Sequence, residues 1–376
     1  MIMFRLEPRA VERYLTAILG AEVRVVRISS IREISDAERG LKAYGYGTPV
    51  RLDYTIDGQQ RSAVLETVSP GPFGHEHMAD RAQILLWSHD TSNRLPRHVR
   101  SLDVGTFIRN GDLVSLGRAD ELFLLNEYVE GTGYFRDLER LRDGTPLSET
   151  DTARADALCD YLVQIHSVCG VTPELYKRRI RELVGGNECI MGLADAYPAT
   201  GDEIRPGQIE SIERACVRWR WQLKDRAHRL RQVHGDFHPW NILFREGTDF
   251  TVLDRARGEW GEPADDVTCL TMNYLFFSLQ ASGTVDGPLG ALFRRFWTRY
   301  LAATGDDEML RVAAPFLAFR GLVMANPTWY PHLPPGVRRT LLAFVETVLD
   351  VPSFDPAGVA DYCGLAHPAS EARERP

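Results

Sequence analysis

The chain has 376 residues, of which 44% are hydrophobic and 26% are charged, so it can bury a large core within one domain or two. This composition excludes disordered, collagen-like and disulfide-scaffold proteins. The formal net charge of -8 and the sequence pI of about 5.7 argue against a protein that holds nucleic acid or an anionic membrane mainly by charge.

The cysteines and the amino terminus further restrict the class of protein to which the chain can belong. The six cysteines form no Cys-x-x-Cys pair, which favours reduced thiols over a zinc site or a disulfide framework. The amino terminus carries charges where a signal peptide needs an apolar stretch, and no later run approaches the ~20 apolar residues that span a bilayer. We therefore expect a cytoplasmic protein with no membrane partner and no nucleic-acid partner.

The first part of the chain predicts a small unit that mixes helices with strands. Apolar residues recur at helical spacing in two segments, and Asp57-Gly58 is a strong hairpin signal between two extended segments. In chain order the pattern predicts a helix at 7–19, strands at 24–34, 48–56 and 61–68, a helix at 75–89, and extended runs at 112–117 and 121–129.

From about residue 134 the apolar spacing becomes helical, apart from one island of two short strand-like runs, 241–244 and 250–253. The predicted helices occupy 150–169, 173–184, 208–231, 264–280, 287–303, 307–325 and 335–349. We therefore predict an α+β protein with a small amino-terminal lobe (1–130), a large, mainly helical carboxy-terminal lobe (131–366) and a flexible tail (367–376).

The island carries the residues with the clearest chemistry. His234, Asp236 and Asn241 form the pattern H-x-D-x-x-x-x-N, and Asp254 follows at the end of the second short strand. Such a set suits phosphoryl transfer, in which one carboxylate accepts a hydroxyl proton while an amide oxygen and a second carboxylate hold Mg²⁺ against nucleotide phosphates. We predict Asp236 as the base and Asn241 and Asp254 as the metal ligands. Taken singly, each residue is more typical of a polar loop.

The segments HGDFHPWNILF and VLDRARGEWGEPADD, which span 234–244 and 252–266, resemble the aminoglycoside phosphotransferase and choline kinase-like family of small-molecule kinases. The segment LLNEYVEG (124–131) and the helix around His166 extend the resemblance. It implies a bilobal protein-kinase-like fold with a hinge at about 126–131, and ATP or GTP as the phosphoryl donor. It also implies that Asp266 braces the catalytic loop (234–241) and that His234 has a structural role within it.

Other candidate residues follow from the same resemblance. Four residues close to the motif in sequence are candidates for contacts with substrate or phosphate, although packed aromatic rings and solvent-facing arginines are equally consistent: His238, Trp240, Arg255 and Arg257. The hinge would present its backbone groups to adenine. The alternative is that this segment is an ordinary edge strand. The residues concerned are Asn126, Glu127, Tyr128 and Val129.

The sequence departs from kinases of this fold at the third strand, which usually carries a lysine for the α- and β-phosphates. Here Glu66 or Thr67 occupies that place. The small lobe has one lysine, Lys42, near Gly45 and Gly47, so we hypothesise that Lys42 reaches the phosphates; the alternative is a solvated loop lysine. Glu76 is the candidate partner of the cation, and Arg61 and Arg81 are candidate substitutes for the lysine.

Acceptor specificity should come from the helical lobe, with residues between 320 and 331 as candidate pocket walls: Arg320, Asn326, Trp329 and Tyr330. The lobe has only a weak acidic excess, and a basic patch is predicted at 177–181, so a neutral or anionic hydroxyl compound fits as well as an aminoglycoside. The favoured function is a Mg²⁺-dependent small-molecule kinase acting on an antibiotic or a metabolite. The alternatives are a pseudokinase that senses nucleotide and a nucleotidyl transferase on the same fold.

Overall fold

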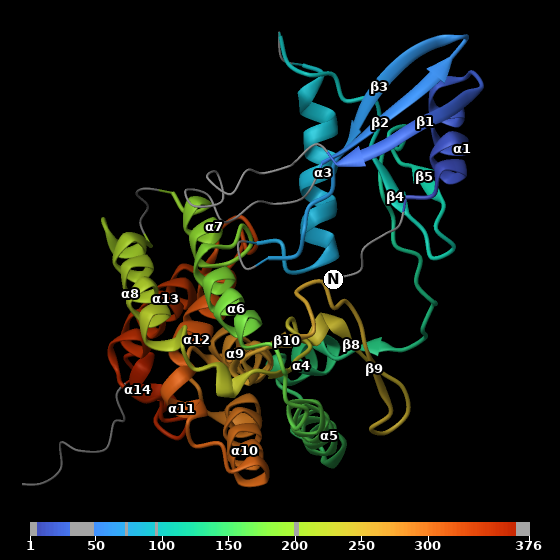
Figure 1. Ribbon diagram of the computed structural model, residues 1–376. Helices are drawn as coiled ribbons and strands as arrows, with labels where there is room; N and C mark the ends of the chain where they lie inside the picture. The colour runs from blue at the N-terminus through green and yellow to red at the C-terminus, as the bar shows by residue number, and fades with distance from the viewer. Residues whose placement is uncertain (1–5, 31–48, 72–73, 95–96, 199–202, 366–376) are drawn as a thin grey trace, which may run out of the picture. The chain divides into compact units, whose positions relative to one another are not determined.

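The computed structural model describes residues 6–30, 49–71, 74–94, 97–198 and 203–365 (Figure 1). Lys42, Gly45, Gly47 and the tail lie outside these described residues. The chain divides into two compact units, residues 1–126 and 127–376. The amino-terminal unit contains an antiparallel sheet and the carboxy-terminal unit is mainly helical, so the predicted α+β class is confirmed.

The amino-terminal unit is built on a helix and a three-stranded sheet. Helix α1 (Pro8–Leu19) begins with a proline in its first turn and ends at Gly20, whose positive φ of 73° favours glycine. Strands β1 (Val23–Ser30), β2 (Val50–Ile56) and β3 (Gln59–Leu65) pair antiparallel in that order. Asp57 and Gly58, both with positive φ, form the predicted turn between β2 and β3. A small core of Val11, Leu15, Val23, Leu52 and Tyr54 joins α1 to the sheet.

Several predicted boundaries in this unit are wrong. Strand β3 ends at Leu65, so Glu66 and Thr67 follow the strand. The next helix, α3 (Met78–Ser92), begins after Glu76, because the His77 side chain and Asp80 cap it in a reciprocal pair of hydrogen bonds. Residues 105–107 (β4) and 113–115 (β5) form a short hairpin. The run 121–129 is neither helix nor strand, and its apolar side chains are largely exposed, as with Phe123 at 90%.

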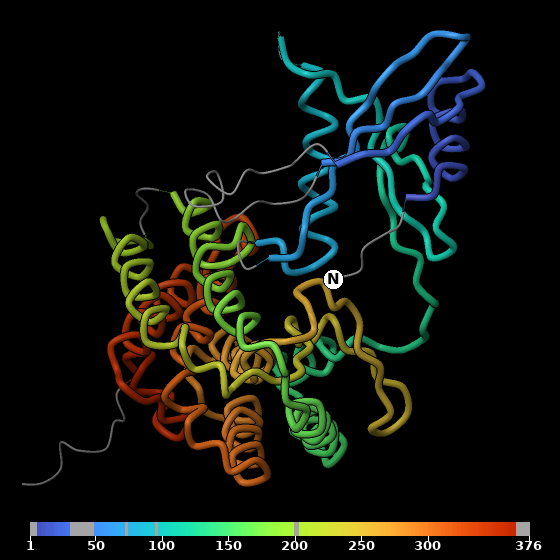
Figure 2. The backbone as a smooth tube through the Cα atoms, in the orientation of Figure 1, coloured from blue at the N-terminus to red at the C-terminus, as the bar shows by residue number. Residues whose placement is uncertain are grey.

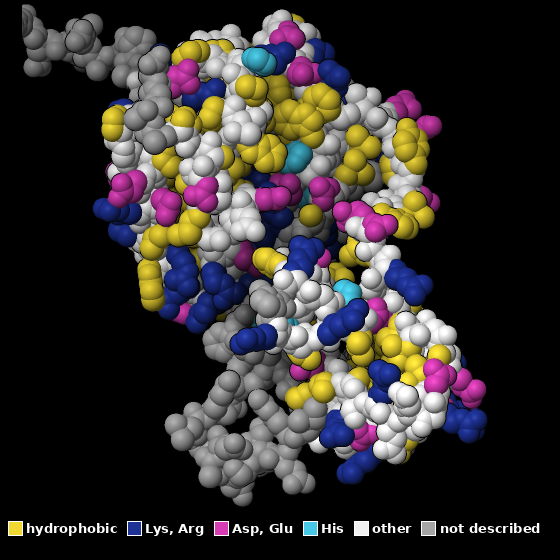
Figure 3. Space-filling view, turned by 90° about the horizontal axis from the view of Figure 1, so that it is seen from above, with side chains coloured by type: hydrophobic (Ala, Val, Ile, Leu, Met, Phe, Trp, Pro, Cys, Tyr) yellow, Lys and Arg dark blue, Asp and Glu magenta, His cyan; other side chains and the backbone are white. Residues whose placement is uncertain are grey.

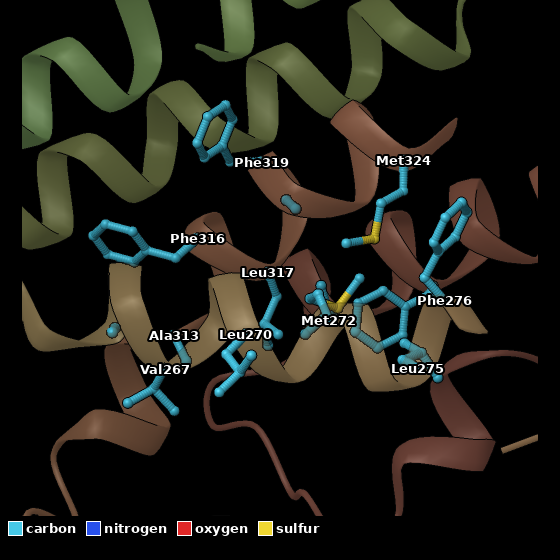
Figure 4. Packing of buried hydrophobic residues seen from close by; sticks show 14 of the residues in the cluster. Val267, Leu270, Met272, Leu275, Phe276, Ala313, Phe316, Leu317, Phe319 and Met324 are labelled. Carbon is cyan, nitrogen blue, oxygen red and sulfur yellow. The ribbon is translucent and has the colours of Figure 1, made fainter. Parts of the chain in front are cut away.

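The carboxy-terminal unit is organised around one buried helix, α9. Every residue of α9 from Pro263 to Leu279 is buried, so the helix is covered on all sides, mainly by α4, α10 and α12. Figure 4 shows the contact with α12, where the side chain of Leu317 points toward Leu270. The helices are α4 (Phe135–Arg142), α5 (Glu149–His166), α6 (Pro173–Gly185), α7 (Ile190–Asp195), α8 (Gln208–Leu223), α9 (Pro263–Ser282), α10 (Gly287–Thr304), α11 (Met309–Val312), α12 (Ala314–Ala325), α13 (Pro335–Asp350) and α14 (Val359–Tyr362).

Two predicted helices are shorter than expected. The helix predicted over 208–231 ends at Leu223, and the chain continues through a short 3-10 turn (Ala227–Arg229) into strand β7 (Arg231–Gln232). The helix predicted over 307–325 is two helices, α11 and α12, because Pro315 in the first turn of α12 cannot continue the preceding helix.

Short strands hold the predicted island in place. Strand β6 (Thr132–Gly133) pairs with β8 (Ile242–Phe244), which pairs with β9 (Phe250–Val252), and β7 pairs with β10 (Trp260–Gly261). Figure 2 follows the backbone through these strands, with β6 drawn in green and the segment from β7 to β10 in yellow. On the face of the molecule drawn in Figure 3, acidic and basic side chains are interspersed. None of the helices in the described ranges has the length and apolarity to cross a bilayer.

Candidate active site

The loop between β7 and β8 carries the motif residues. Gly235 has a φ of +88°, and a Cβ atom there would lie 3.2 Å from the Cβ of Arg257 and 3.4 Å from a guanidinium nitrogen of Arg179. Only glycine fits this turn without strain. The glycine between His234 and Asp236 therefore sets the path of the loop.

Asp266, near the start of α9, binds the backbone of the motif loop. Its carboxylate is fully buried and accepts hydrogen bonds from the backbone N–H groups of His234 and Gly235, each at 2.7 Å. Its Oδ2 atom also lies 3.1 Å from Nε2 of His166, whose Nδ1 contacts the hydroxyl of Tyr300. Burial by itself raises the pKa of Asp266, but the bonds from His166 and His234 outweigh it and lower the pKa.

Asp236 is partly buried, with 19% of its side chain exposed, and its two carboxylate oxygens have different surroundings. Oδ1 accepts a hydrogen bond of 2.7 Å from Nη1 of Arg320. Oδ2 lies 3.7 Å from Nε2 of His238, beyond hydrogen-bond distance. Burial raises the pKa of Asp236, but the charges of Arg320 and Arg257 outweigh burial and hold the pKa below its usual range. The carboxylate is therefore ionised at neutral pH, as a base must be.

Asn241 and Asp254 lie at the same end of the β8–β9 hairpin. The backbone N–H of Leu253 donates to the carbonyl of Asn241, next to the pair Ile242 and Val252. Asp254 follows Leu253 and has a φ of 52°, a left-handed conformation that aspartate tolerates better than most residues. Nδ2 of Asn241 donates to the carbonyl of Asp236 at 3.1 Å, which ties the hairpin to the motif loop.

The chemistry of these two residues fits a magnesium ion. Because Nδ2 of Asn241 is committed to the Asp236 carbonyl, its Oδ1 atom is the group left to bind a cation. Mg²⁺ prefers oxygen ligands and typically takes one or two from protein, with phosphates and waters as the rest. The described ranges contain no cluster of three or more His, Cys, Asp or Glu side chains that could bind metal. Asn241 and Asp254 would thus rely on a bound nucleotide to complete the site.

Two arginines from distant helices meet the motif loop, and their roles there could not be predicted from the sequence. Arg320 of α12, predicted as a pocket wall, is buried and bonds to Asp236 and Asp265. Arg179 of α6, predicted in a basic patch, is also buried and donates to Asp265. The patch prediction is wrong as stated, because Lys177, Arg178 and Arg179 are all paired with carboxylates.

The remaining residues near the motif have distinct surroundings. Trp240 is 38% exposed and its ring stacks on Phe135 at 5.4 Å. The backbone N–H of Trp240 donates to Nδ1 of His238, which leaves the ring proton of neutral His238 on Nε2. Arg255 donates to the carbonyl of Val233 and so fastens the motif loop.

Arg257 lies between the motif loop and α12. Its guanidinium group lies over the ring of Phe319 at 5.1 Å, and its carbonyl accepts a hydrogen bond from Arg179. Of the candidate pocket walls, Asn326 is buried and accepts from the backbone N–H of Thr328, whereas Trp329 is 62% exposed.

The residues predicted to contact the nucleotide come from both units. In the amino-terminal unit, Arg81 donates to the carbonyls of His75 and Glu76, which fixes the turn before α3, and Arg61 is exposed on β3. Asn126 ends this unit. Glu127 and Tyr128 begin the carboxy-terminal unit as exposed residues, followed by the half-buried Val129.

Comparison with known proteins gives one family and a set of distantly similar structures. The chain matches the phosphotransferase enzyme family (APH) over residues 86–311. No curated protein matches significantly. A glucosamine kinase solved with glucosamine, ADP and inorganic phosphate is 19% identical, with 56% of this chain and 58% of that chain covered and a TM-score of 0.39.

Two further solved structures are similar over most of their length. Amicoumacin kinase hAmiN, in complex with AMP-PNP, Ca²⁺ and Ami, is 15% identical, with 85% of this chain and 90% of that chain covered and a TM-score of 0.40. The macrolide 2'-phosphotransferase MphH from Brachybacterium faecium is 13% identical, with 93% of this chain and 99% of that chain covered and a TM-score of 0.29.

Proposed function

The chain belongs to the phosphotransferase enzyme family, and from this membership we propose the reaction that it catalyses. This membership confirms the family resemblance and the protein-kinase-like fold predicted from the sequence. The proposed reaction moves the γ-phosphoryl group of ATP or GTP to a hydroxyl group of a small molecule, an antibiotic or a metabolite.

The observation that carries the proposal is the state of Asp236. Its carboxylate is ionised, one oxygen is held by Arg320, and the other faces His238 without a hydrogen bond to it. A general base must accept a proton from a hydroxyl at hydrogen-bond distance, and Oδ2 of Asp236 has the capacity to do so. In the proposed reaction Oδ2 orients the acceptor hydroxyl and takes its proton as the oxygen attacks the γ-phosphorus.

The metal would be held by Oδ1 of Asn241 and the carboxylate of Asp254. When bound, Mg²⁺ supplies positive charge that neutralises the phosphates as charge develops on the leaving group. The hydrogen bond from Asn241 to the carbonyl of Asp236 supports this assignment, because it couples the ligand to the base. The β8–β9 pairing supports it as well, because it brings Asp254 to the end of the hairpin where Asn241 lies.

The nucleotide contacts that the sequence predicts are proposed unchanged. Lys42 is proposed as the phosphate cation, with Gly45 and Gly47 allowing the backbone to approach and Glu76 pairing with the cation. Adenine would meet backbone groups of the hinge at 126–129. These assignments rest on the family resemblance.

The acceptor is proposed to be neutral or anionic. Three arginines gather around the base and its carboxylate neighbour Asp265: Arg179, Arg257 and Arg320. These arginines offset the negative charge of Asp236 and Asp265, so the described surroundings of the base lack the strong acidic excess that would attract a polycationic aminoglycoside. A sugar, a nucleoside or an uncharged antibiotic with a hydroxyl group fits this environment better.

Calorimetric titration with ATP and with GTP, each with and without Mg²⁺, is the first test. Magnesium-dependent binding would support the proposal and identify the donor, and γ-labelled nucleotide would then be used to screen hydroxyl compounds. Nucleotide binding without phosphoryl transfer to any acceptor or to water would favour the pseudokinase. The absence of a lysine from the third strand is the feature that motivates this alternative. Covalent label from the α-phosphate would instead select a nucleotidyl transferase.

A further inference from the structure

Arg320 links the proposed base to the helical core. It lies in the middle of α12 and only 5% of it is exposed. Its Nη1 atom donates to Oδ1 of Asp236 at 2.7 Å, and its Nη2 atom donates to Oδ1 of Asp265 at 2.8 Å. One guanidinium group therefore bridges a carboxylate of the motif loop and a carboxylate of α9.

A second buried arginine extends this bridge to α6. Oδ2 of Asp265 accepts a hydrogen bond of 2.9 Å from Nη2 of Arg179. Nη1 of Arg179 donates to the carbonyl of Arg257, in the segment that follows the metal-ligand candidate Asp254. Alternating charges thus connect α6, α9, α12 and the loop in one network.

We propose that Arg320 is a positioning residue that fixes the carboxylate plane of Asp236, so that Oδ2 alone is presented to the acceptor hydroxyl. The proposal rests on the proposed function, in which Asp236 is the base. A planar guanidinium group fixes the direction of each hydrogen bond that it donates, whereas an ammonium group holds its partner as a point charge. The Cζ atom of Arg320 also lies over the ring of Phe319, 4.5 Å from its centroid, so a cation–π contact adds to the hydrogen bonds that hold the guanidinium group.

The role of Arg320 goes beyond filling the core, because the carboxylate it holds reaches the surface. Asp236 keeps 19% of its side chain exposed, whereas the other partner, Asp265, keeps 4%. Without Arg320, the Asp236 side chain would rotate about its own bonds toward solvent, and Oδ2 would lose its fixed direction. An error of about 1 Å in the position of a catalytic group can lower turnover by about 10²-fold.

The test uses the full chain with Mg²⁺ and ATP, and with water as the acceptor, so that released inorganic phosphate is measured without knowledge of the natural acceptor. Arg320→Lys keeps the charge, and Arg320→Ala leaves a cavity that guanidinium ion can fill. We expect turnover to fall by about 10²-fold in Arg320→Ala. We expect a smaller loss in Arg320→Lys, and nucleotide affinity unchanged in both. Low, non-denaturing concentrations of guanidinium chloride should restore turnover in Arg320→Ala alone.

Arg229 provides a matched control. It is also 5% exposed and also bridges carboxylates, Glu262 and Asp306 by hydrogen bonds and Glu308 by an ion pair, and none of the side-chain bonds described for it reaches the motif loop. Arg229→Ala should lower the melting temperature, leave turnover per folded molecule within about threefold of wild type, and show no recovery with guanidinium.

Each outcome decides the proposal. The positioning role is overturned if the turnover of Arg320→Ala stays within threefold of wild type. It is also overturned if guanidinium chloride restores turnover equally in Arg320→Ala and Arg229→Ala. If Arg320→Ala does not fold, Arg320→Lys decides, because unchanged turnover in a folded lysine variant also overturns the proposal. A wild-type protein that neither binds nucleotide nor releases phosphate refutes the proposed function itself, which separates the two failures.

Discussion

At the scale of single residues, Asp236 gives the most direct prediction. Asp236→Asn keeps the size of the side chain and its bond to Arg320 through the amide oxygen, but removes the ability to take a proton. We expect kcat to fall by about two to four orders of magnitude, the usual contribution of a positioned general base, while Mg²⁺-nucleotide still binds. Steady-state kinetics and calorimetry measure the two effects. Turnover within tenfold of wild type would remove Asp236 from the role of base.

Asp254 gives a second prediction at this scale, because its proposed ligand role and its backbone conformation can be separated. Asp254→Asn and Asp254→Gly both tolerate the φ of 52°. We expect both variants to weaken Mg²⁺-dependent nucleotide binding by at least about tenfold. Their free energies of unfolding should stay within about 1 kcal/mol of wild type. Calorimetry at several magnesium concentrations and urea denaturation provide the measurements.

Asp249 on the same hairpin is the control for Asp254. It is an exposed residue near the turn between β8 and β9, and the bonds described for its carboxylate are all to Arg245. Asp249→Asn should leave the magnesium dependence unchanged. An equal loss of Mg²⁺-dependent nucleotide binding in the Asp249 and Asp254 variants would show that the loss of either charge on the hairpin weakens binding. That outcome would contradict a ligand role for Asp254.

At the scale of elements, the start of α9 and the motif loop act as one unit through Asp266. An amide at this position offers one oxygen where the carboxylate offers two, so Asp266→Asn leaves a backbone N–H of His234 or Gly235 without its acceptor. An unsatisfied buried group costs about 1–3 kcal/mol of stability. We expect denaturation to show that loss at neutral pH, together with reduced turnover because the loop is no longer held.

The pH dependence of the same variant has a definite sign. The pKa of Asp266 is lowered in the folded protein, so its contribution to stability is present at neutral pH and above the unfolded-state value of about 3.9. It is lost as the pH falls through the lowered folded-state pKa. Wild type and Asp266→Asn should therefore converge in acid. As a control, Asp160→Asn, which breaks an exposed pair with Arg299, should cost at most about 1 kcal/mol.

The elements that could be predicted from the sequence are those set by local patterns. The turn at Asp57-Gly58 depends on two adjacent residues with positive φ. The β8–β9 hairpin is encoded in two short apolar runs around a glycine turn. The run 121–129 has the composition of a strand but forms none in the described chain, because a strand needs hydrogen bonds from a neighbour that composition cannot specify.

The contacts that could not be predicted are separated by long stretches of chain. Arg320 lies 84 residues from Asp236, and Arg179 lies 86 residues from Asp265. Neither arginine belongs to a motif, and an arginine on a helix is more often exposed than buried. The only local signal for Arg320 was its place in an otherwise apolar helix, where an isolated charge must find a buried partner.

At the scale of the whole molecule, the two units have separate hydrophobic clusters of very different size. The described part of the amino-terminal unit buries one small cluster around Leu52, whereas the carboxy-terminal cluster runs from Tyr134 to Cys363 and includes most of the apolar side chains of α9. The stability that burial supplies grows with the apolar area removed from water. We therefore expect the amino-terminal unit to unfold first on heating.

Matched core substitutions test this order of unfolding. Leu52→Ala and Leu158→Ala each remove a buried leucine side chain, the first from the small cluster and the second from the large one, at a cost of about 2–5 kcal/mol. In differential scanning calorimetry, Leu52→Ala should shift only the earlier transition and Leu158→Ala only the later one. A single transition that moves equally in both variants would mean that the clusters unfold together. In that case the two units would be one cooperative structure in solution, despite the division of their cores.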